Sequence, residues 1–366
     1  MNIEREKFIN KYPNIKINQQ EIGINFPTYF IADIGANHDG DINRAKDLIC
    51  LAKESGADAA KFQHFKASTI VNDKGFKNLV GVQSHQSNWN KSVYEVYEDA
   101  SIDLTWTEEL KKTCDENDIE FMTSPYDIDL LHRLNPFINA IKIGSGDITW
   151  HNLLREASLL QKPLLLATGA STLSEVIKAV EVVQENCSEL ILFQCNTNYT
   201  GNNDNFRYIN LNVLKTYSTL FPNLILGLSD HTPGHSTVLG AISLGACVIE
   251  KHFTDSKNRV GPDHSFALDP NEWTEMIERS RELELALGSQ HKNIEFNEQE
   301  TVILQRRSLF YNKPLAKGSI ITDEDLIPLR PSPKNGLQPY EDHLVIGKKL
   351  NTSVDANQPV SLNDYE

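Results

Sequence analysis

Two histidines closely follow two neighbouring apolar segments of the chain. His231 comes after the run Asn223–Leu228, and His252 comes after the run Ala246–Ile249. Both runs read as buried parallel strands, and the segment beginning at His235 between them has helical length and apolar spacing. Parallel strands joined in this way lie roughly 4.8 Å apart, so residues just past their ends can meet. A single histidine at a strand end is usually only hydrogen-bonded, but this pair predicts a shared metal ion.

Two lysines lie inside other predicted strands. Lys61 lies in Ala59–Gln63, where the two-residue period places it on the same face as Gln63, and Lys142 lies in Ala140–Ile143. An ammonium group inside a packed sheet is costly without an anionic partner. That partner is either a bound phosphate or carboxylate, or an acidic side chain. Three acidic residues lie near predicted strand ends: Asp33, Asp147 and Glu250.

The elements that position these residues repeat in one order, a short apolar strand followed by a helix. The predicted strands are Tyr29–Ile34, Ala59–Gln63, Ile119–Thr123, Ala140–Ile143, Pro163–Ala167, Leu190–Gln194, Leu224–Leu228 and Cys247–Glu250. The predicted helices are Ile42–Ser55, Thr107–Asn117, Ile128–Leu134, Trp150–Leu160, Leu173–Glu185, Asn212–Phe221, His235–Leu244 and Asn271–Leu287. This alternation over roughly 260 residues predicts an α/β fold, the (β/α)₈ TIM barrel. A doubly wound open sheet would more naturally have about five to seven strands.

A barrel collects its chemistry at the carboxyl ends of its strands. Polar residues follow every predicted strand. The fourth strand is followed by Gly144, Ser145 and Gly146, and the fifth by Thr168 and Gly169. Backbone N–H groups and hydroxyls there could bind the same oxyanion as the lysines.

The remaining segments predict a domain organisation. Residues 1–28 are expected to form a β-hairpin that caps the lower end of a barrel spanning 29–288. Within the barrel, Lys66–Ser101 is a long insertion on the catalytic rim, where such loops often cover substrates. Residues 289–300 have the polar composition of a linker, and 301–366 predict a second, small, irregular domain.

Composition excludes several classes of function. The chain has 366 residues, of which 40% are hydrophobic and 23% charged, so it can bury a large core. Its net charge of −15 argues against nucleic-acid binding. No apolar run approaches about 18 residues, so we expect no membrane span and a cytoplasmic protein. The five cysteines have no CxxC spacing and predict reduced thiols.

Several motifs together resemble the sialic acid synthase family of nonulosonic acid synthases. They cover nearly the whole chain, and their combination is specific although each motif alone is not. The motifs are Asp33–Gly40, Gly56–Asp58 with Lys61–Gln63, Lys142–Asp147, Gly227–Thr232, Ile249–Thr254, Gly261–His264 and Arg306–Leu309. Residues 301–366 resemble the antifreeze-like (SAF) domain of that family.

The resemblance implies a reaction in which phosphoenolpyruvate and water combine with the open-chain aldehyde of an N-acyl hexosamine. The products are a nine-carbon 2-keto-3-deoxy acid and phosphate. The resemblance also implies a divalent cation, Mn²⁺ or Mg²⁺, held by His231 and His252, that polarises the aldehyde. It implies a domain-swapped homodimer in which Arg330 of the small domain lies over the barrel of the other subunit.

The same resemblance, with the strand positions, implies three groups of site residues. Those expected to bind phosphoenolpyruvate are Lys61, Gln63, Lys142, Ser145, Thr168 and Ser229. Those expected to contact the sugar are Asn196, Tyr199, Asp263 and Arg330. The expected catalytic residues are Glu250, which would handle a proton or order water, with Asp33, Lys61 and Asp147.

The chain departs from the family pattern at a few positions. Asp33 stands where the family usually has Glu, and Thr200 follows Tyr199 where Pro is usual. The turn Pro331–Lys334 is longer and more polar than usual, and Lys66–Ser101 differs from the insertion of the best-known members. The sugar therefore stays open between N-acetylmannosamine, its 6-phosphate and a diacetamido 6-deoxy hexose.

Three other functions fit parts of the pattern. A related synthase acting on a sugar phosphate would need further basic residues for the second phosphate, and the sequence has no clear cluster of them. An aldolase forming a Schiff base through Lys61 or Lys142 would need no metal. The small domain also suits a carbohydrate-binding or ice-binding protein with a degenerate barrel. The two lysines and two histidines favour an enzyme.

Overall fold

The computed structural model describes residues 13–79 and 91–365 of the chain. Contacts within it divide the chain into two compact units, and the division falls between Gly288 and Ser289. Each unit is described by itself.

Eight parallel strands form the sheet of the first unit. They are β3 (Tyr29–Asp33), β4 (Ala59–His64), β5 (Glu120–Pro125), β6 (Ile141–Ile143), β7 (Leu164–Ala167), β8 (Leu190–Cys195), β9 (Ile225–Asp230) and β10 (Ala246–His252). Their order is β5-β4-β3-β10-β9-β8-β7-β6, and the edge strands β5 and β6 also contact each other. The sheet is a nearly closed barrel, which confirms the predicted TIM barrel.

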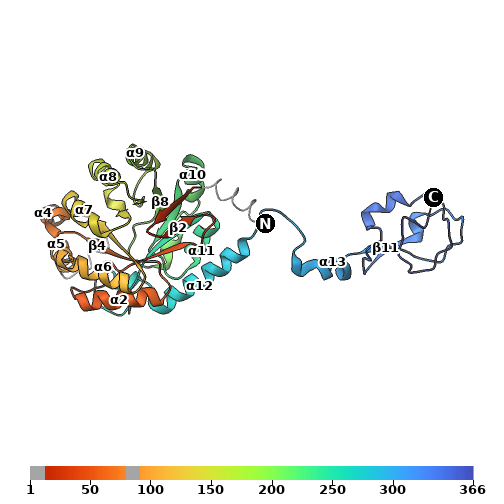
Figure 1. Cartoon of the computed structure of the whole chain (residues 1–366), viewed down its shortest axis with the longest axis horizontal. Coiled ribbons are helices and arrows are strands. Elements are labelled where there is room, and N and C mark those ends of the chain that lie inside the picture. The colour runs from red at the N-terminus through yellow and green to blue at the C-terminus, as the bar shows by residue number, and fades with distance from the viewer. Residues whose placement is uncertain (1–12, 80–90, 366) are drawn as a thin grey trace. The chain divides into compact units, whose positions relative to one another are not determined.

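A ring of helices surrounds this sheet (Figure 1). The helices are α2 (Ile42–Glu54), α6 (Thr107–Glu116), α7 (Ile128–Leu134), α8 (His151–Leu159), α9 (Leu173–Gln184), α10 (Val213–Leu220), α11 (Ser236–Ser243) and α12 (Pro270–Leu287). Local sequence fixes several of their starts: Asp41 caps α2, and Thr172 and Asp269 form capping boxes at α9 and α12. Apolar side chains of the helices and the outer strand faces form the largest core.

A hairpin of β1 (Asn14–Ile17) and β2 (Gln20–Gly23) closes one end of the barrel. Ile22 is fully buried and packs among side chains of the barrel interior. The turn and β2 also hydrogen-bond to Asp58 and Glu120, at the starts of β4 and β5. The hairpin therefore covers the amino ends of the strands, as the sequence predicted.

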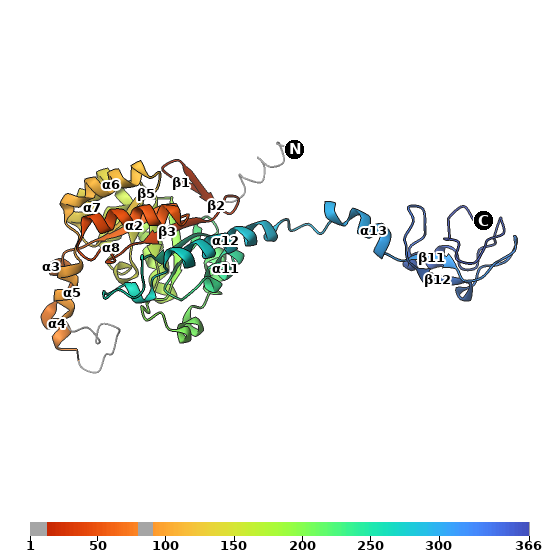
Figure 2. The same cartoon turned by 90° about the horizontal axis from the view of Figure 1, so that it is seen from below.

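The described parts of the insertion after β4 lie at the other end of the barrel (Figure 2). They form three short helices, α3 (Ala67–Ile70), α4 (Asp73–Lys77) and α5 (Val93–Ala100). A capping box between Ser92 and Glu95 starts α5. The insertion follows the carboxyl end of β4 directly, so it lies on the rim where the sequence placed it.

The second unit contains α13 (Gln299–Gln305) and one antiparallel pair, β11 (Ser308–Tyr311) and β12 (Leu326–Leu329). The sequence predicted a linker over 289–300 and a small irregular domain after it, and it did not predict α13. The residues Thr322–Asp325 form a capping box around a single 3₁₀ turn. Buried apolar residues give this unit a core of its own: Leu309, Tyr311, Ile321, Leu337, Val345, Leu350, Val354 and Val360.

In the described parts of both units, none of the helices combines the length and the apolar character needed to cross a membrane.

Candidate active site at the carboxyl ends of the strands

Two lysines and two carboxylates meet inside the barrel. Lys61 Nζ lies 2.6 Å from Asp33 Oδ2 and 3.8 Å from Glu250 Oε1. Lys142 Nζ lies 3.4 Å from the same Glu250 oxygen, and all four side chains are buried. The strand register produces this cluster, because Asp33 is paired directly with Lys61 and Glu250 with Ser229.

The charges of this cluster stabilise one another. Burial alone would raise the pKa of Asp33, but the charges of Lys61 and His252, with hydrogen bonds from Lys61 and Gln63, lower it to about 2. Burial likewise opposes the charge of Lys61, yet Asp33 and Glu250 raise the pKa of Lys61. Both groups are therefore ionised at neutral pH. The sequence left open whether a bound anion or an acidic side chain pairs with the two lysines. In this structure acidic side chains do so.

The two carboxylate oxygens of Glu250 differ in their hydrogen bonding. Its Oε1 faces both lysines and accepts a hydrogen bond from Ser229 Oγ at 3.3 Å. Its Oε2 is buried and has no hydrogen-bond partner among the described residues. A buried carboxylate oxygen without a donor is costly, so it favours a bound water or ligand hydroxyl.

The two histidines lie beside this cluster. The ring centroids of His231 and His252 are 5.5 Å apart. His231 Nδ1 donates to the carbonyl oxygen of Asn196 at 2.8 Å. His252 Nε2 lies 3.6 Å from Asp33 Oδ2, and its Nδ1 lies 3.8 Å from Asp263 Oδ2. The predicted pair therefore does meet, and His252 lies between two carboxylates.

Both histidines fit a divalent cation in residue type, and the protonation of His231 also fits it. Because Nδ1 of His231 donates to a carbonyl, Nε2 carries the lone pair that a metal would use. Burial and the neighbouring His252 lower the pKa of His231 to about 3, which keeps the imidazole neutral. The described residues hold no ready group of three or more His, Cys, Asp or Glu ligands. The protein would thus supply two imidazoles, and water or substrate the remaining ligands.

The other residues expected to bind phosphoenolpyruvate divide into two groups. Gln63 lies near the end of β4 and donates to Asp33 at 3.0 Å. Ser145 lies just after β6, and its Oγ accepts from the backbone N–H of Gly169 at 2.9 Å. Thr168 is committed elsewhere: its hydroxyl is hydrogen-bonded to the carbonyl of Phe193 and to Tyr217 of α10. The structure does not bring the Thr168 hydroxyl to the lysines.

The residues expected to contact the sugar come from three loops. Asn196 and Tyr199 follow β8, and the Tyr199 ring lies 4.4 Å from the His231 ring. Asp263 follows β10 and accepts from the backbone N–H of Ala36 at 3.0 Å. Arg330 is exposed, directly after β12 in the second unit.

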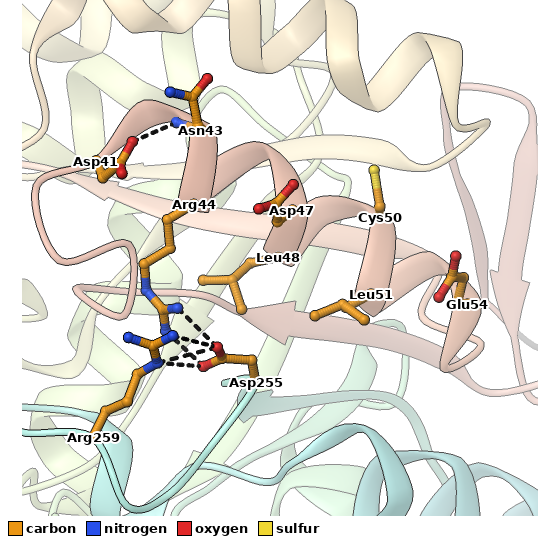
Figure 3. A pocket seen from close by; sticks show the side chains of 10 residues that line it. All are labelled: Asp41, Asn43, Arg44, Asp47, Leu48, Cys50, Leu51, Glu54, Asp255 and Arg259. Atoms are coloured by element: carbon orange, nitrogen blue, oxygen red, sulfur yellow. Dashed lines mark hydrogen bonds and ion pairs between the residues drawn. The ribbon is translucent and has the colours of Figure 1, made fainter.

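Two arginines hold the loop that carries Asp263. Arg44 of α2 donates to both oxygens of Asp255 at 2.8 and 2.6 Å, and Arg259 adds a bond at 2.9 Å. A groove of about 620 Å³ runs along α2 beside this network (Figure 3). It is lined by none of the residues predicted for the site, so the network positions the loop rather than the substrate.

Sequence reasoning assigned no role to several residues around the site. His264 is fully buried and bonds to Thr254 at 2.8 Å and to Asp39 at 2.9 Å, which ties the same loop to the one after β3. Phe65 and Tyr126 directly follow β4 and β5, so the rule that sites form at strand ends could have found them. Helix α5 belongs to the insertion that the sequence placed on the catalytic rim, but no single residue of it was predicted for the site.

Asp147 gives a prediction about stability. Burial raises its pKa to about 6, although Lys142 partly opposes the shift. The folded pKa exceeds the unfolded value, so the wild-type protein loses stability as pH rises from about 4 to 6. Asp147→Asn cannot ionise, and we expect it to be more stable than wild type by on the order of 2 kcal/mol at pH 8, and unchanged at pH 4.

Urea denaturation at the two pH values measures this difference. Asp118→Asn is the matched control, because the Asp118 side chain is fully exposed. An equal effect of Asp147→Asn at both pH values would contradict the buried ionisation.

Comparisons with known proteins agree with this geometry. The NeuB family model matches residues 48–292, and the SAF domain model matches residues 306–366. The N,N'-diacetyllegionaminic acid synthase of Legionella pneumophila is 36% identical over 342 residues, 91% of this chain and 93% of that protein. The pseudaminic acid synthase of Helicobacter pylori is 32% identical over 346 residues, 93% of this chain and 98% of that protein.

One solved structure shows the same fold. The N-acetylneuraminic acid (sialic acid) synthetase of Leptospira borgpetersenii, crystallised with citrate, is 27% identical with a TM-score of 0.70. The match covers 80% of this chain and 95% of that one. With both family models and full-length relatives in agreement, the chain belongs to the NeuB family and carries a SAF domain.

Proposed function

We propose that this protein condenses phosphoenolpyruvate with the open-chain aldehyde of an N-acyl hexosamine, giving a nonulosonic acid and phosphate. The observation that carries the proposal is the buried cluster of Lys61, Lys142, Asp33 and Glu250 beside His231 and His252. The relatives named as legionaminic and pseudaminic acid synthases support it. Phosphoenolpyruvate is a cytoplasmic metabolite, so we place the reaction in the cytoplasm.

The reaction balances without a redox partner. The methylene carbon of phosphoenolpyruvate forms a bond to the aldehyde carbon, and water adds to the second carbon. The bond between that carbon and the phosphate oxygen then breaks, so the keto acid forms and inorganic phosphate leaves. The enzyme is on this basis a transferase.

The buried cluster suits the anionic substrate. Lys61 and Lys142, here paired with Asp33 and Glu250, are the cations that would meet the carboxylate and phosphate of phosphoenolpyruvate, with Gln63, Ser145 and Ser229 as hydrogen-bond partners. Lys142 and Lys61 keep Glu250 Oε1 occupied, which leaves Oε2 to accept a proton from the attacking water. Asp33 holds Lys61 in place.

The aldehyde end lies near the histidines. His231 and His252 would hold a divalent cation, Mn²⁺ or Mg²⁺, which would supply Lewis-acid polarisation of the aldehyde oxygen. Asn196, Tyr199 and Asp263 lie around the histidines, on the side from which the sugar would approach: the backbone carbonyl of Asn196 and the Tyr199 ring contact His231, and the Asp263 carboxylate lies beside His252. The side-chain amide of Asn196 is bonded within its own loop, to Tyr208 and Asn198. Asp147, with its pKa raised to about 6 by burial, can take or give a proton near neutral pH.

Two alternatives are disfavoured on physical grounds. A Schiff-base aldolase needs a neutral amine, whereas Asp33 and Glu250 raise the pKa of Lys61 and keep it charged. A synthase for sugar phosphates needs cations around a second phosphate, and the described cavity beside His252 has no Lys or Arg in its lining.

Phosphate release tests the proposed reaction. The protein with Mn²⁺ should release phosphate from phosphoenolpyruvate when given N-acetylmannosamine or a diacetamido 6-deoxy hexose, and chelator should stop the release. A malachite-green assay with each sugar measures it, with no-sugar reactions as the control. No release with any N-acyl hexosamine, from protein shown to bind phosphoenolpyruvate, would contradict the proposal.

The metal role of the histidines has a separate test. Changes in second-shell residues alone cost 10–100-fold, so loss of a ligand in His231→Ala or His252→Ala should lower turnover by at least about 100-fold. Thermal melts should stay near wild type. His132→Ala is the matched control, because that histidine is half exposed on the surface. Wild-type turnover of either variant in chelated buffer would exclude the shared metal.

We also propose that the active form is a domain-swapped homodimer in which Arg330 serves the site of the other subunit. Arg330→Ala should fold normally and bind the sugar more weakly. Random mixtures of Arg330→Ala and His252→Ala chains should recover roughly a quarter of wild-type activity, because half of the dimers have one intact site. Each variant alone is the control, and no recovery in the mixture would contradict the swapped arrangement.

A further inference from the structure

A cavity of about 140 Å³ lies between the strand-end site and the insertion after β4. One part of its lining carries polar residues already placed in the site, Gln63, Tyr199, His252 and Asp263, with Ala36 and Pro262 beside Asp263. The other part is largely apolar and comes from the insertion and the adjoining strand ends: Phe65, Ile70, Val96, Tyr97, Ala100 and Tyr126. We call this second part the α5 wall. The cavity is therefore polar at the metal-binding end and apolar at the other.

Aromatic contacts hold the α5 wall together. The Phe65 ring lies 5.2 Å from the Tyr97 ring and 5.8 Å from the Tyr126 ring. Burial raises the pKa of Tyr97, and the nearby charges of Asp263 and Asp147 raise it further. Burial also raises the pKa of Tyr126 well above its usual value. Both phenols stay protonated, so the wall carries no charge of its own.

The electrostatics of the cavity exclude an anionic end on the sugar. The carboxylates of Asp263 and Asp147 lie near enough to the α5 wall to raise the pKa of Tyr97. The described lining supplies neither Lys nor Arg to pair with a phosphate. A phosphate placed there would lose its water and meet like charge. Burying a methyl group there is favourable by contrast, because it removes apolar surface from water.

We propose that the α5 wall is a subsite for a methyl group on the sugar, so that the substrate is an unphosphorylated N-acyl hexosamine with an apolar substituent remote from its aldehyde. This inference rests on the proposed function, which places the aldehyde beside His252. The methyl group is either a deoxy carbon at position 6 or the methyl of a second acetamido group. Val96 and Ala100 of α5 are then residues that determine specificity.

Two matched pairs of sugars distinguish a deoxy carbon at position 6 from the methyl of a second acetamido group. The first pair is N-acetylmannosamine and its 6-deoxy analogue, which differ only in a hydroxyl. The second pair is the 6-deoxy sugar with either a hydroxyl or an acetamido group at position 4. The 6-phosphate of N-acetylmannosamine completes the set. For each sugar, kcat/KM is measured by phosphate release at saturating phosphoenolpyruvate.

The wild-type protein should prefer the 6-deoxy sugar of the first pair, or the acetamido sugar of the second pair, by about tenfold or more. It should use the 6-phosphate least. The variant Val96→Thr with Ala100→Ser adds hydroxyls at nearly constant volume and should reduce that preference by about tenfold. The KM for phosphoenolpyruvate should stay unchanged. Glu98→Gln is the matched control, because Glu98 is an exposed residue of the same helix.

Each outcome separates this inference from the reaction itself. A ratio of two sugars measured on one preparation does not depend on the fraction of folded protein, so a partly misfolded variant still gives an answer. Turnover with no preference for a methyl group, or a preference that the double variant leaves unchanged, overturns the subsite and leaves the condensation standing. No turnover with any sugar overturns both.

Discussion

The pairing of Lys61 with Asp33 is the interaction on which the rest of the site depends. Both side chains are almost fully buried, and taking either charge out of water alone would cost several kcal/mol. Neighbouring strands bring them opposite each other, at 2.6 Å, and Glu250 extends the pair to Lys142. A barrel that closes in another register would separate these charges. The same contacts that make the interior stable therefore fix where a substrate can be bound.

The last strand shows why the polar strand ends could be predicted and their extent could not. The sequence predicted a strand ending at Glu250, but β10 continues to His252. Lys251 points to the opposite face from its neighbours, where its ammonium lies 2.5 Å from Asp230 and 2.6 Å from the carbonyl of Thr232. A buried salt bridge lets polar residues continue a strand that an apolar pattern alone would end.

Side chains at the site were predictable where backbone periodicity decides their place. The period of two placed Lys61 and Gln63 together, and strand neighbours brought His231 to His252. Thr168 was not predictable in this way, because its hydroxyl is used by Tyr217 on a helix far away in sequence. The α5 wall and the Asp255 network depend on how loops pack across the rim, which no local pattern encodes.

The hairpin that closes the amino ends of the strands has a consequence for how the protein can change over time. Its buried isoleucines, Ile15, Ile17 and Ile22, pack into the same interior core as the strands but contribute nothing to the cluster of charges at their other ends. Substitutions at the carboxyl ends of the strands that lower stability can thus be offset by stabilising substitutions in the hairpin and its core, without disturbing the charged cluster. The carboxyl ends of the strands can therefore accept substitutions that change function, while the hairpin end of the barrel supplies the stability that such substitutions cost.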